Sequence, residues 1–265
     1  MVRKVQLLLL SSPLVRAYRA VRRAWQISRY LLRRPITHGE DFAAFARFPA
    51  RPGLFLDVGA SSGTSAMSFR VFNRRNPILS IEPNATLEKE LRFLTRSVRG
   101  FDYLIAAAGD QHGTITMYVP FYMGVPLTAY TASSREDVMD ERGGLHDWLG
   151  ERMTRPEFHV QEVTAEVVAL DDLNLSPAFI KIDVEGSELQ VLRGLAATLE
   201  RCHPILLIER SRDFEAIREL LKAGGYSAFG YRGDVGRFVP FASLGAGPNV
   251  FFLRPDAIPR DAVER

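Results

Sequence analysis

The chain has 265 residues, of which 46% are apolar and 25% charged, and its formal net charge is +3. A chain of this length and composition predicts one globular domain with extensions. The single cysteine, Cys202, excludes an internal disulfide and a four-cysteine zinc site, and no apolar run reaches the ~18 residues that span a bilayer. We therefore expect a cytoplasmic protein.

Positive charge is concentrated in the first 34 residues, which contain nine Lys or Arg and no acid. The rest of the chain then has 34 − 9 = 25 basic and 31 acidic residues, a net charge of −6. Apolar side chains interleave with the basic ones at roughly helical spacing, so we predict a basic amphipathic helical arm and linker over residues 1–48.

Three uses of this arm are open: docking on its own domain or on a second copy in a homodimer, peripheral contact with the anionic inner face of a membrane, or a cleaved signal peptide. No recognisable nucleic-acid module follows it, so we expect no nucleic-acid partner.

The first predicted element after the arm is a strand at 53–56 that runs into the glycine-rich turn D-V-G-A-S-S-G over 57–63. A predicted helix over 64–75 and a second strand over 77–81 follow, and that strand ends on Glu82. This order is typical of a parallel sheet that binds an adenosyl cofactor. The glycines let the backbone approach the ligand, and the carboxylate of Glu82 can accept both ribose hydroxyls.

The identity of the cofactor follows from the acid that opens the turn. A dinucleotide fold usually reads G-x-G-x-x-G, whereas this turn reads D-x-G-x-S-x-G. Asp57 would repel a pyrophosphate but suits a ligand with an ammonium group, which favours S-adenosylmethionine over NAD. The alternative is a structural turn in which Asp57 caps the next helix.

The remaining elements continue the alternation of strands and helices. We predict a strand at 101–107, a turn at 109–113, a hairpin partner at 114–119, an irregular insertion at about 120–163, strands at 164–169, 179–183 and 205–208, a helix at 212–223, and strands at 226–231 and 249–253. This pattern predicts an α/β fold: a Rossmann-like, doubly wound, mainly parallel seven-stranded sheet with an antiparallel edge over 49–256, and a C-terminal tail at 257–265.

Several motifs occur together and in order over about 54–210. They are D-V-G-A at 57–60 with Gly63, I-E-P-N at 81–84, A-A-G-D at 107–110 before Gly113, L-D-D-L at 170–173, and K-I-D-V-E-G-S-E at 181–188 with L-R-G at 192–194. In these the chain resembles the FkbM-type methyltransferases within the class I S-adenosylmethionine-dependent fold. The resemblance implies methyl transfer to oxygen, typically a hydroxyl of a sugar, glycolipid or polyketide-type product. One departure is Ser61, where the family often has Asn.

Acidic residues end several of the predicted strands, and the carboxyl ends of parallel strands form one rim of a sheet. Asp57, Glu82, Asp183 and Glu209 are therefore expected to gather there, with Glu82 on the ribose and Asp183 near the methyl group. The candidate cofactor-binding residues are Asp57, Gly59, Ser61, Gly63, Glu82, Pro83, Asn84, Ala107 and Asp183.

A sugar hydroxyl is a weak acid, so a base or a metal ion helps to remove its proton. Asp183 or Glu185 can be that base, and Asp183 with Glu209 can hold Mg²⁺ as a second cofactor. His112 is a further catalytic candidate near the rim. Histidines in the insertion, His146 and His159, are alternatives.

Two kinds of function are open beside an O-methyltransferase. One is an N-methyltransferase acting on a small acceptor. The other is a non-catalytic, cofactor-binding or membrane-associated scaffold protein with the same fold.

Overall fold

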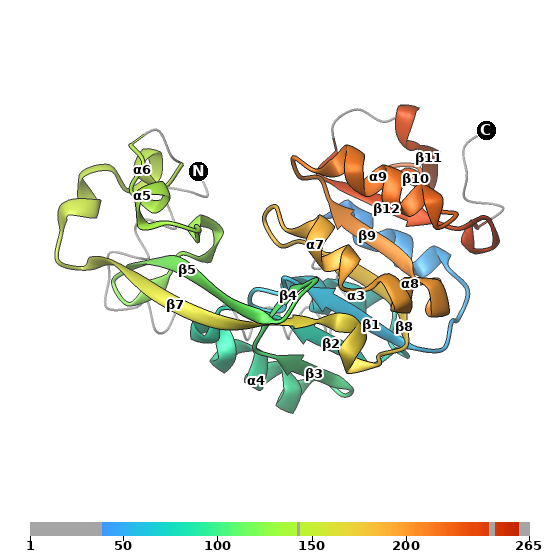
Figure 1. Cartoon of the computed structure of the whole chain (residues 1–265), viewed down its shortest axis with the longest axis horizontal. Coiled ribbons are helices and arrows are strands. Elements are labelled where there is room, and N and C mark those ends of the chain that lie inside the picture. Colours follow the sequence, from blue (N-terminus) through green and yellow to red (C-terminus); the bar gives the residue numbers. More distant parts are fainter. Residues whose placement is uncertain (1–38, 142–143, 244–246, 260–265) are drawn as a thin grey trace. The chain divides into compact units, whose positions relative to one another are not determined.

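The computed structural model describes residues 39–141, 144–243 and 247–259, so the predicted arm over residues 1–34 lies outside them. The described residues form two units (Figure 1). One is the insertion, Thr114–Ala165, and the other comprises the chain up to Gly113 and from Glu166 onward. In the described part of the chain, no helix is long and apolar enough to cross a membrane.

The larger unit is built on a mixed sheet. Its strands are β1 (Leu54–Val58), β2 (Ile78–Ile81), β3 (Phe101–Leu104), β8 (Pro177–Ile182), β9 (Ile205–Glu209), β10 (Ser227–Arg232), β11 (Arg237–Pro240) and β12 (Asn249–Leu253). They are ordered β11-β10-β12-β9-β8-β1-β2-β3. The five strands from β9 to β3 are parallel, and β12, β10 and β11 form the expected antiparallel edge.

The sheet has eight strands rather than the seven that the sequence predicts. The additional strand is β11, which pairs with β10 as a hairpin through a turn that contains Gly236 at φ 66°. At four residues, β11 is too short to show a clear alternation of apolar and polar side chains.

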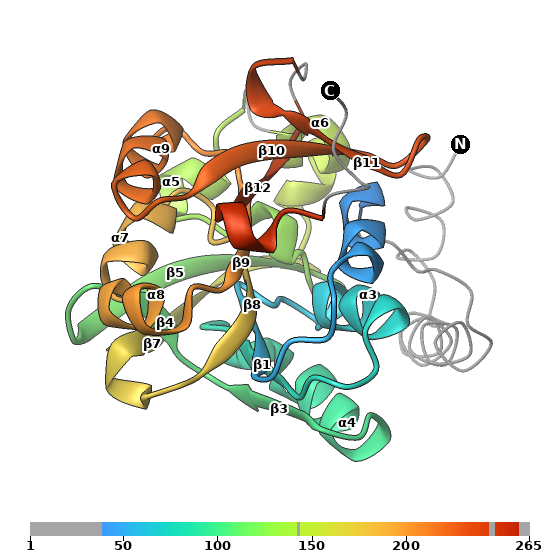
Figure 2. The ribbon, with the colours of Figure 1, turned by 90° about the vertical axis from the view of Figure 1, so that its right-hand side faces the viewer.

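Helices cover both faces of this sheet, as predicted (Figure 2). They are η1 (Glu40–Arg47), α3 (Thr64–Phe72), η2 (Ala85–Leu87), α4 (Glu88–Ser97), η5 (Leu170–Leu173), α7 (Glu188–Arg193), α8 (Ala196–Cys202), α9 (Phe214–Ala223), η6 (Phe241–Ser243) and η7 (Pro255–Ala257). Because side chains alternate along a strand, Leu56 and Ile180 face an aliphatic core that includes Val191 of α7 and Ile217 of α9. Their neighbours Phe55 and Phe179 face the opposite side.

Aromatic rings fill that opposite side and bring η1 into the core. The Phe45 ring lies 5.0 to 5.8 Å from the rings of Phe55, Phe69, Phe179 and Phe251. The sequence predicts a linker up to residue 48, but residues 40–47 form a helix that belongs to the folded unit. Burial of these rings at edge-to-face distances stabilises the helix, although the sequence of this segment shows no regular helical pattern.

The strand predicted at 101–107 is divided in two. β3 ends at Leu104, and β4 (Ala107–Gly109) belongs to a second sheet, in which it pairs with the end of β7 (Phe158–Ala169). The order of this sheet is β4-β7-β5-β6, with β5 at Gly113–Tyr122 and β6 at Val125–Pro126. The sequence does not predict this division, because the apolar run is continuous across it.

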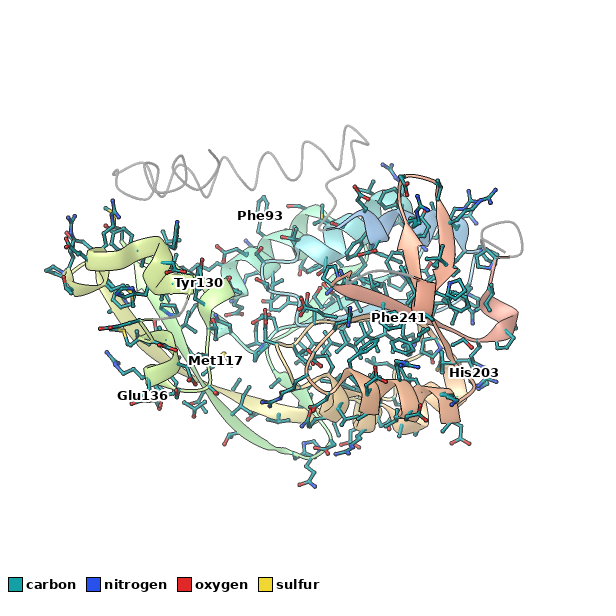
Figure 3. The ribbon with its side chains drawn as sticks, turned by 90° about the horizontal axis from the view of Figure 1, so that it is seen from above. Phe93, Met117, Tyr130, Glu136, His203 and Phe241 are labelled. Atoms are coloured by element: carbon teal, nitrogen blue, oxygen red, sulfur yellow. The ribbon has the colours of Figure 1, made fainter. Side chains whose placement is uncertain are left out.

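The insertion predicted at about 120–163 lies within the compact unit Thr114–Ala165, and it is regular rather than irregular. Between β5 and β7 it contains η3 (Thr128–Tyr130), α5 (Arg135–Val138), α6 (Gly144–Leu149) and η4 (Gly150–Thr154). It has its own small core, which includes Tyr122, Leu145 and Val160, and the Tyr130 ring stacks on Trp148 at 5.9 Å (Figure 3). The insertion therefore packs as a unit with its own apolar centre.

Candidate functional site

The glycine-rich turn is held between the ends of β2 and β8. The backbone N–H groups of Gly59 and Ala60 both donate to the carbonyl of Ile81, at 2.9 and 3.1 Å, and Asp183 N–H donates to the Val58 carbonyl at 3.0 Å. Gly59 has φ 81°, and a Cβ there would lie 1.7 Å from the carbonyl oxygen of Asp183. Only glycine allows this approach of two backbones.

The end of the turn starts the next helix. Gly63, at φ 80°, is the N-cap residue of α3, and a Cβ on it would lie 2.3 Å from Leu94 Cδ1. Ser61 also adopts a left-handed conformation, at φ 48°. Asn tolerates this conformation better than Ser does. The Asn that the family often has at this position would therefore also fit the backbone of the turn.

Glu82 lies directly after β2 and is buried. Its Oε2 accepts the Ser61 N–H at 2.7 Å, and its Oε1 accepts the Asn84 N–H at 2.9 Å. Burial raises the pKa of Glu82 to about 7, although these two hydrogen bonds favour the charged form. The carboxylate is therefore fixed against the glycine-rich turn, where the sequence places it.

The two residues that follow Glu82 start a short helix. Asn84 is the N-cap of η2, and its Oδ1 accepts hydrogen bonds from the backbone and hydroxyl of Thr86. The Asn84 side-chain oxygen is thus occupied by hydrogen bonds to Thr86. Pro83 lies between Asn84 and Glu82.

Asp57 is completely buried in β1. Its Oδ2 accepts hydrogen bonds from the hydroxyls of Ser65, at 2.6 Å, and Ser80, at 3.3 Å. Its Oδ1 has no hydrogen-bond partner among the described residues. Burial raises the pKa of Asp57. Asp57 does not cap α3, because Gly63 holds the N-cap position and Asp57 contacts a hydroxyl rather than a backbone N–H.

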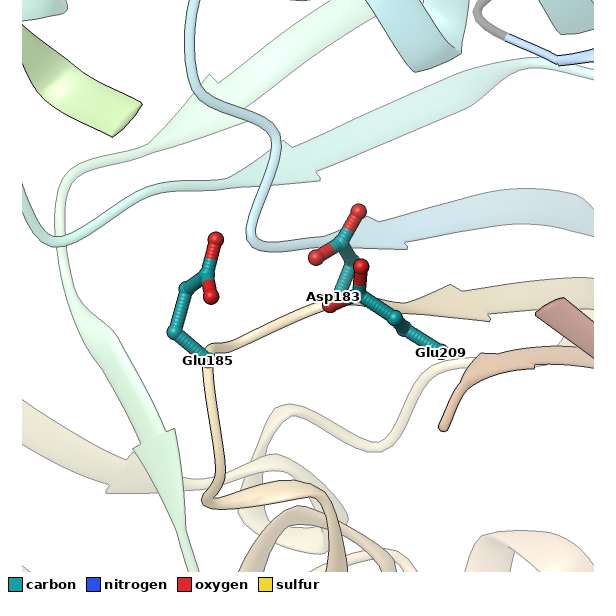
Figure 4. A group of neighbouring side chains, drawn as sticks. All are labelled: Asp183, Glu185 and Glu209. Carbon is teal, nitrogen blue, oxygen red and sulfur yellow. The ribbon is translucent and has the colours of Figure 1, made fainter. Parts of the chain in front are cut away.

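Three carboxylates meet beyond the ends of β8 and β9. One oxygen each of Asp183, Glu185 and Glu209 lies within 4.8 Å of the others (Figure 4). We call these three residues the acid group. Lys181, buried in β8, donates from Nζ to Asp183 Oδ2 at 2.6 Å. Lys181 is therefore paired with a member of the acid group itself.

The charges within the acid group are not equivalent. Burial, followed by a hydrogen bond with Asp183 and the charge of that residue, raises the pKa of Glu209 to about 8. The raised pKa favours the protonated form of Glu209 beside Asp183, whose negative charge Lys181 stabilises. Burial, then the charge of Asp183, also raises the pKa of Glu185.

The loop that carries Glu185 is held by a buried carboxylate, Glu188. Glu185 and Gly186 have φ values of 56° and 107°, and Glu188 Oε1 accepts the N–H groups of Val184 and Gly186, both at 3.1 Å. Sequence reasoning assigned Glu188 no role. Glu188 is the first residue of α7, and a side-chain oxygen near a helix start often accepts nearby backbone N–H groups.

The hydrogen bond of His112 is with Asp172 and not with a member of the acid group. Its Nε2 lies 2.6 Å from Asp172 Oδ2, and both side chains are largely exposed. The preceding residue, Asp171, accepts the N–H groups of Ala197 and Thr198 at the start of α8. The L-D-D-L motif thus supplies a helix cap and a partner for His112.

The other candidates lie in the second sheet or the insertion. Ala107 is in β4 and pairs with Val167. His146 lies in α6, and the His159 ring stacks on Phe121 at 5.1 Å.

A parallel sheet with acids at its carboxyl edge beside a glycine-rich turn defines an α/β domain of the cofactor-binding class. Residues 57–228, more than half of the chain, match the family described as the methyltransferase FkbM domain. The chain belongs to this family of methyltransferases, which confirms the resemblance seen in its motifs.

Solved structures with a similar fold are distant in sequence. A methyltransferase FkbM from Methylobacillus flagellatus KT is 16% identical, with a TM-score of 0.47, and the match covers 88% of this chain and 59% of that one. Aeropyrum pernix fibrillarin with bound S-adenosyl-L-methionine is 12% identical (TM-score 0.39; 79% and 72% covered). A Burkholderia thailandensis 1,6-didemethyltoxoflavin-N1-methyltransferase with bound S-adenosylhomocysteine is 13% identical (TM-score 0.33; 91% and 88% covered). A comparison with curated protein sequences gave no match.

Proposed function

We propose that this chain is an S-adenosylmethionine-dependent O-methyltransferase acting on a hydroxyl of a sugar, glycolipid or polyketide-type acceptor. Membership of the FkbM family supports methyl transfer. The observation that carries the choice of oxygen is the acid group beside the glycine-rich turn. A hydroxyl must lose a proton as it is methylated, and carboxylates at this place can accept it.

The residues around the turn fit the proposed cofactor. Gly59 lets the turn lie directly against the backbone of Asp183, since a Cβ there would clash with it, and Glu82 has lone pairs left for ribose hydroxyls beside its two backbone hydrogen bonds. Asp57 Oδ1 is a buried acceptor without a partner in the described chain, which suits an ammonium group reached directly or through water. These three residues would hold the cofactor.

The proton of the acceptor hydroxyl would go to the acid group. When bound, S-adenosylmethionine supplies a methyl group on a positively charged sulfur, which is a strong leaving group. Lys181 stabilises the negative charge of Asp183, and the raised pKa of Glu209 favours its protonated form, so we assign Asp183 and Glu185 as the carboxylates that accept the proton. Their work is to orient the hydroxyl and to take its proton.

The acid group could instead hold Mg²⁺, because its donors are all carboxylate oxygens, which hard cations prefer. Two features oppose this role. Lys181 already neutralises Asp183, and the proton on Glu209 must leave before that oxygen can bind a cation. We therefore favour proton acceptance over metal binding as the role of the acid group.

The experiment that tests the proposal is transfer of a labelled methyl group to extracted glycolipids, free sugars and small amines. Calorimetry with S-adenosylmethionine and with NAD tests the cofactor independently. Label on a hydroxyl of a sugar or glycolipid is the expected result. Label on nitrogen alone would move the chain to the N-methyltransferases, and cofactor binding without transfer to any acceptor would favour a scaffold protein.

A further inference from the structure

An open cavity of about 560 Å³ lies at the edge of the sheet opposite the acid group. Two segments line it: residues 45–53, which lead into β1, and residues 71–77, which lead from α3 into β2. Because both lead into the starts of parallel strands, the cavity is at the amino edge of the sheet. Figure 2 shows η1 beside α3 on this side of the larger unit.

The charged residues that line the cavity all have the same sign. They are Arg51, Arg74 and Arg75, and none of the lining residues is acidic. Arg74 and Arg75 are exposed at the rim, and Arg51 is half-buried. Three lining arginines without a lining acid give the cavity a positive charge, which favours an anionic ligand.

Two asparagines join the backbones of the two segments that carry these arginines. Asn73 Oδ1 accepts the N–H groups of Arg75 and Asn76, at 3.1 and 3.2 Å, and Asn73 Nδ2 donates to Asn76 Oδ1 at 2.8 Å. Asn76 Nδ2 in turn donates to the carbonyls of Arg51 and Gly53, at 2.9 and 2.6 Å. The two arginine-bearing segments are therefore tied together.

The apolar lining that solvent reaches comes from the exposed Pro49 and Ala50 and the half-buried Val71 and Phe72, with the buried Phe45 and Phe48 beneath. Arg51 uses one N–H of its guanidinium on the His203 carbonyl, at 3.2 Å, and the group has further donors. Guanidinium groups match the oxygens of phosphate in geometry as well as in charge. A cationic rim above an apolar wall suits a ligand that has both a phosphate and an apolar chain.

We propose that this cavity binds a phosphate ester carried on an apolar chain, as in the headgroup of an anionic lipid. An anionic lipid also suits the neighbouring sequence. The segment 1–34, which has nine basic residues, ends only a few residues before η1 begins. This inference does not depend on the proposed methyl transfer, since the cavity and the acid group lie at opposite edges of the sheet.

The test uses the full chain and calorimetric titration at constant ionic strength, with monomeric dihexanoyl phosphatidic acid and with inorganic phosphate. The variant is Arg74→Gln/Arg75→Gln, in which both changes are at exposed positions. The matched control is Arg218→Gln/Arg232→Gln, which removes two exposed arginines elsewhere in the same unit. All three proteins keep residues 1–34, so anion binding by those residues cancels in the comparison.

We expect the Arg74/Arg75 variant to bind the lipid at least about tenfold more weakly than the wild type, and the control to bind it unchanged. Tighter binding of the lipid than of inorganic phosphate would assign the cavity to lipid headgroups. Equal binding of both would assign it to free phosphate compounds. Binding that is as strong in the Arg74/Arg75 variant as in the wild type would overturn the proposal. Equal free energies of unfolding of all three proteins in urea would show that the folded domain is intact.

Discussion

At the scale of single residues, Glu82 combines a buried position with a fixed orientation. Its two oxygens accept N–H groups from Ser61 and Asn84, so the carboxylate links the glycine-rich turn to the chain after β2. A ligand in the turn would meet an acceptor that needs no rearrangement. Two predictions follow from this geometry and from the raised pKa.

The first prediction is that Glu82→Ala weakens S-adenosylmethionine binding without unfolding the protein. Two charge-assisted hydrogen bonds to ribose would be lost, each contributing up to about 1.5–3 kcal/mol. We expect affinity to fall by at least roughly tenfold in calorimetry, with Glu82→Gln falling less. An affinity within about twofold of the wild type would contradict the assignment to ribose.

The second prediction concerns stability and pH without cofactor. Burial raises the pKa of Glu82 from 4.5 to about 7. A shift of this size changes the free energy of unfolding by about 3 kcal/mol across this pH range. Because the folded state binds the proton of Glu82 more tightly than the unfolded state does, the contribution of Glu82 to stability is complete below about pH 4.5. It is lost as the pH rises through about 7. Glu82→Gln should therefore gain stability relative to the wild type between about pH 5 and 8 in urea unfolding. Parallel pH profiles for the two proteins would refute the raised pKa.

The third prediction concerns Asp183, whose Oδ2 pairs with Lys181 Nζ at 2.6 Å. Asp183→Asn should reduce turnover by roughly 10²-fold or more, with a far smaller change in cofactor affinity, because the amide cannot accept a proton. EDTA distinguishes the two roles of the acid group: an enzyme that needs metal loses activity and recovers with Mg²⁺. Full activity in the variant would exclude both roles.

At the scale of elements, the loop between β8 and α7 brings Glu185 into the acid group. Two left-handed residues, Glu185 and Gly186, make the loop fold back, and the buried Glu188 accepts its N–H groups. A non-glycine residue in this conformation costs free energy, which surrounding hydrogen bonds must offset. We infer that Glu188 positions Glu185 without touching the acceptor.

The fourth prediction compares two carboxylate caps, the buried Glu188 and the half-buried Asp171. Glu188→Ala and Asp171→Ala each leave two backbone N–H groups without their acceptor, so Glu188→Ala should lower the free energy of unfolding by about 1–3 kcal/mol and Asp171→Ala by less, because water reaches its N–H groups. Only Glu188→Ala should also lower kcat, by roughly tenfold or more, because only its loop carries Glu185. Glu188→Gln should restore much of that loss, since its amide oxygen can still accept both N–H groups. Equal turnover in the two alanine variants would mean that Glu188 supports stability alone.

At the scale of the whole molecule, charge is divided between the arm and the folded domain. The nine basic residues at 1–34 precede a chain with a net charge of −6. This division suits an enzyme whose arm meets an anionic surface and whose acceptor is attached to lipid.

The fifth prediction is that residues 1–34 bind anionic vesicles. Each Lys or Arg near such a surface contributes up to about 1 kcal/mol, so half of the nine would suffice for reversible binding. The full chain should sediment with phosphatidylglycerol vesicles but not with phosphatidylcholine, less so at high salt, and more than a chain that starts at Pro35. Equal, salt-insensitive sedimentation of both chains would leave the arm as a docking or dimerisation helix.

The sequence by itself determined the elements whose signals are local. The turn at 57–63, the apolar strands and the acids at their ends lie within a few residues of each other, so their spacing predicts their conformation. The rule that parallel strands end at one edge then brings Asp183 and Glu209 together, as the structure shows. The family could be inferred from the same local motifs.

The tertiary structure alone decided the contacts between residues far apart in the chain. The place of η1 in the core, the strand β11, the division of 101–109 between two sheets and the Asn76 bonds to Arg51 and Gly53 have no local signal. The sequence also does not predict the pKa values of the acid group, because a pKa depends on burial and on neighbouring charges. A short segment does not specify such interactions, since they form only when packing removes water from both partners.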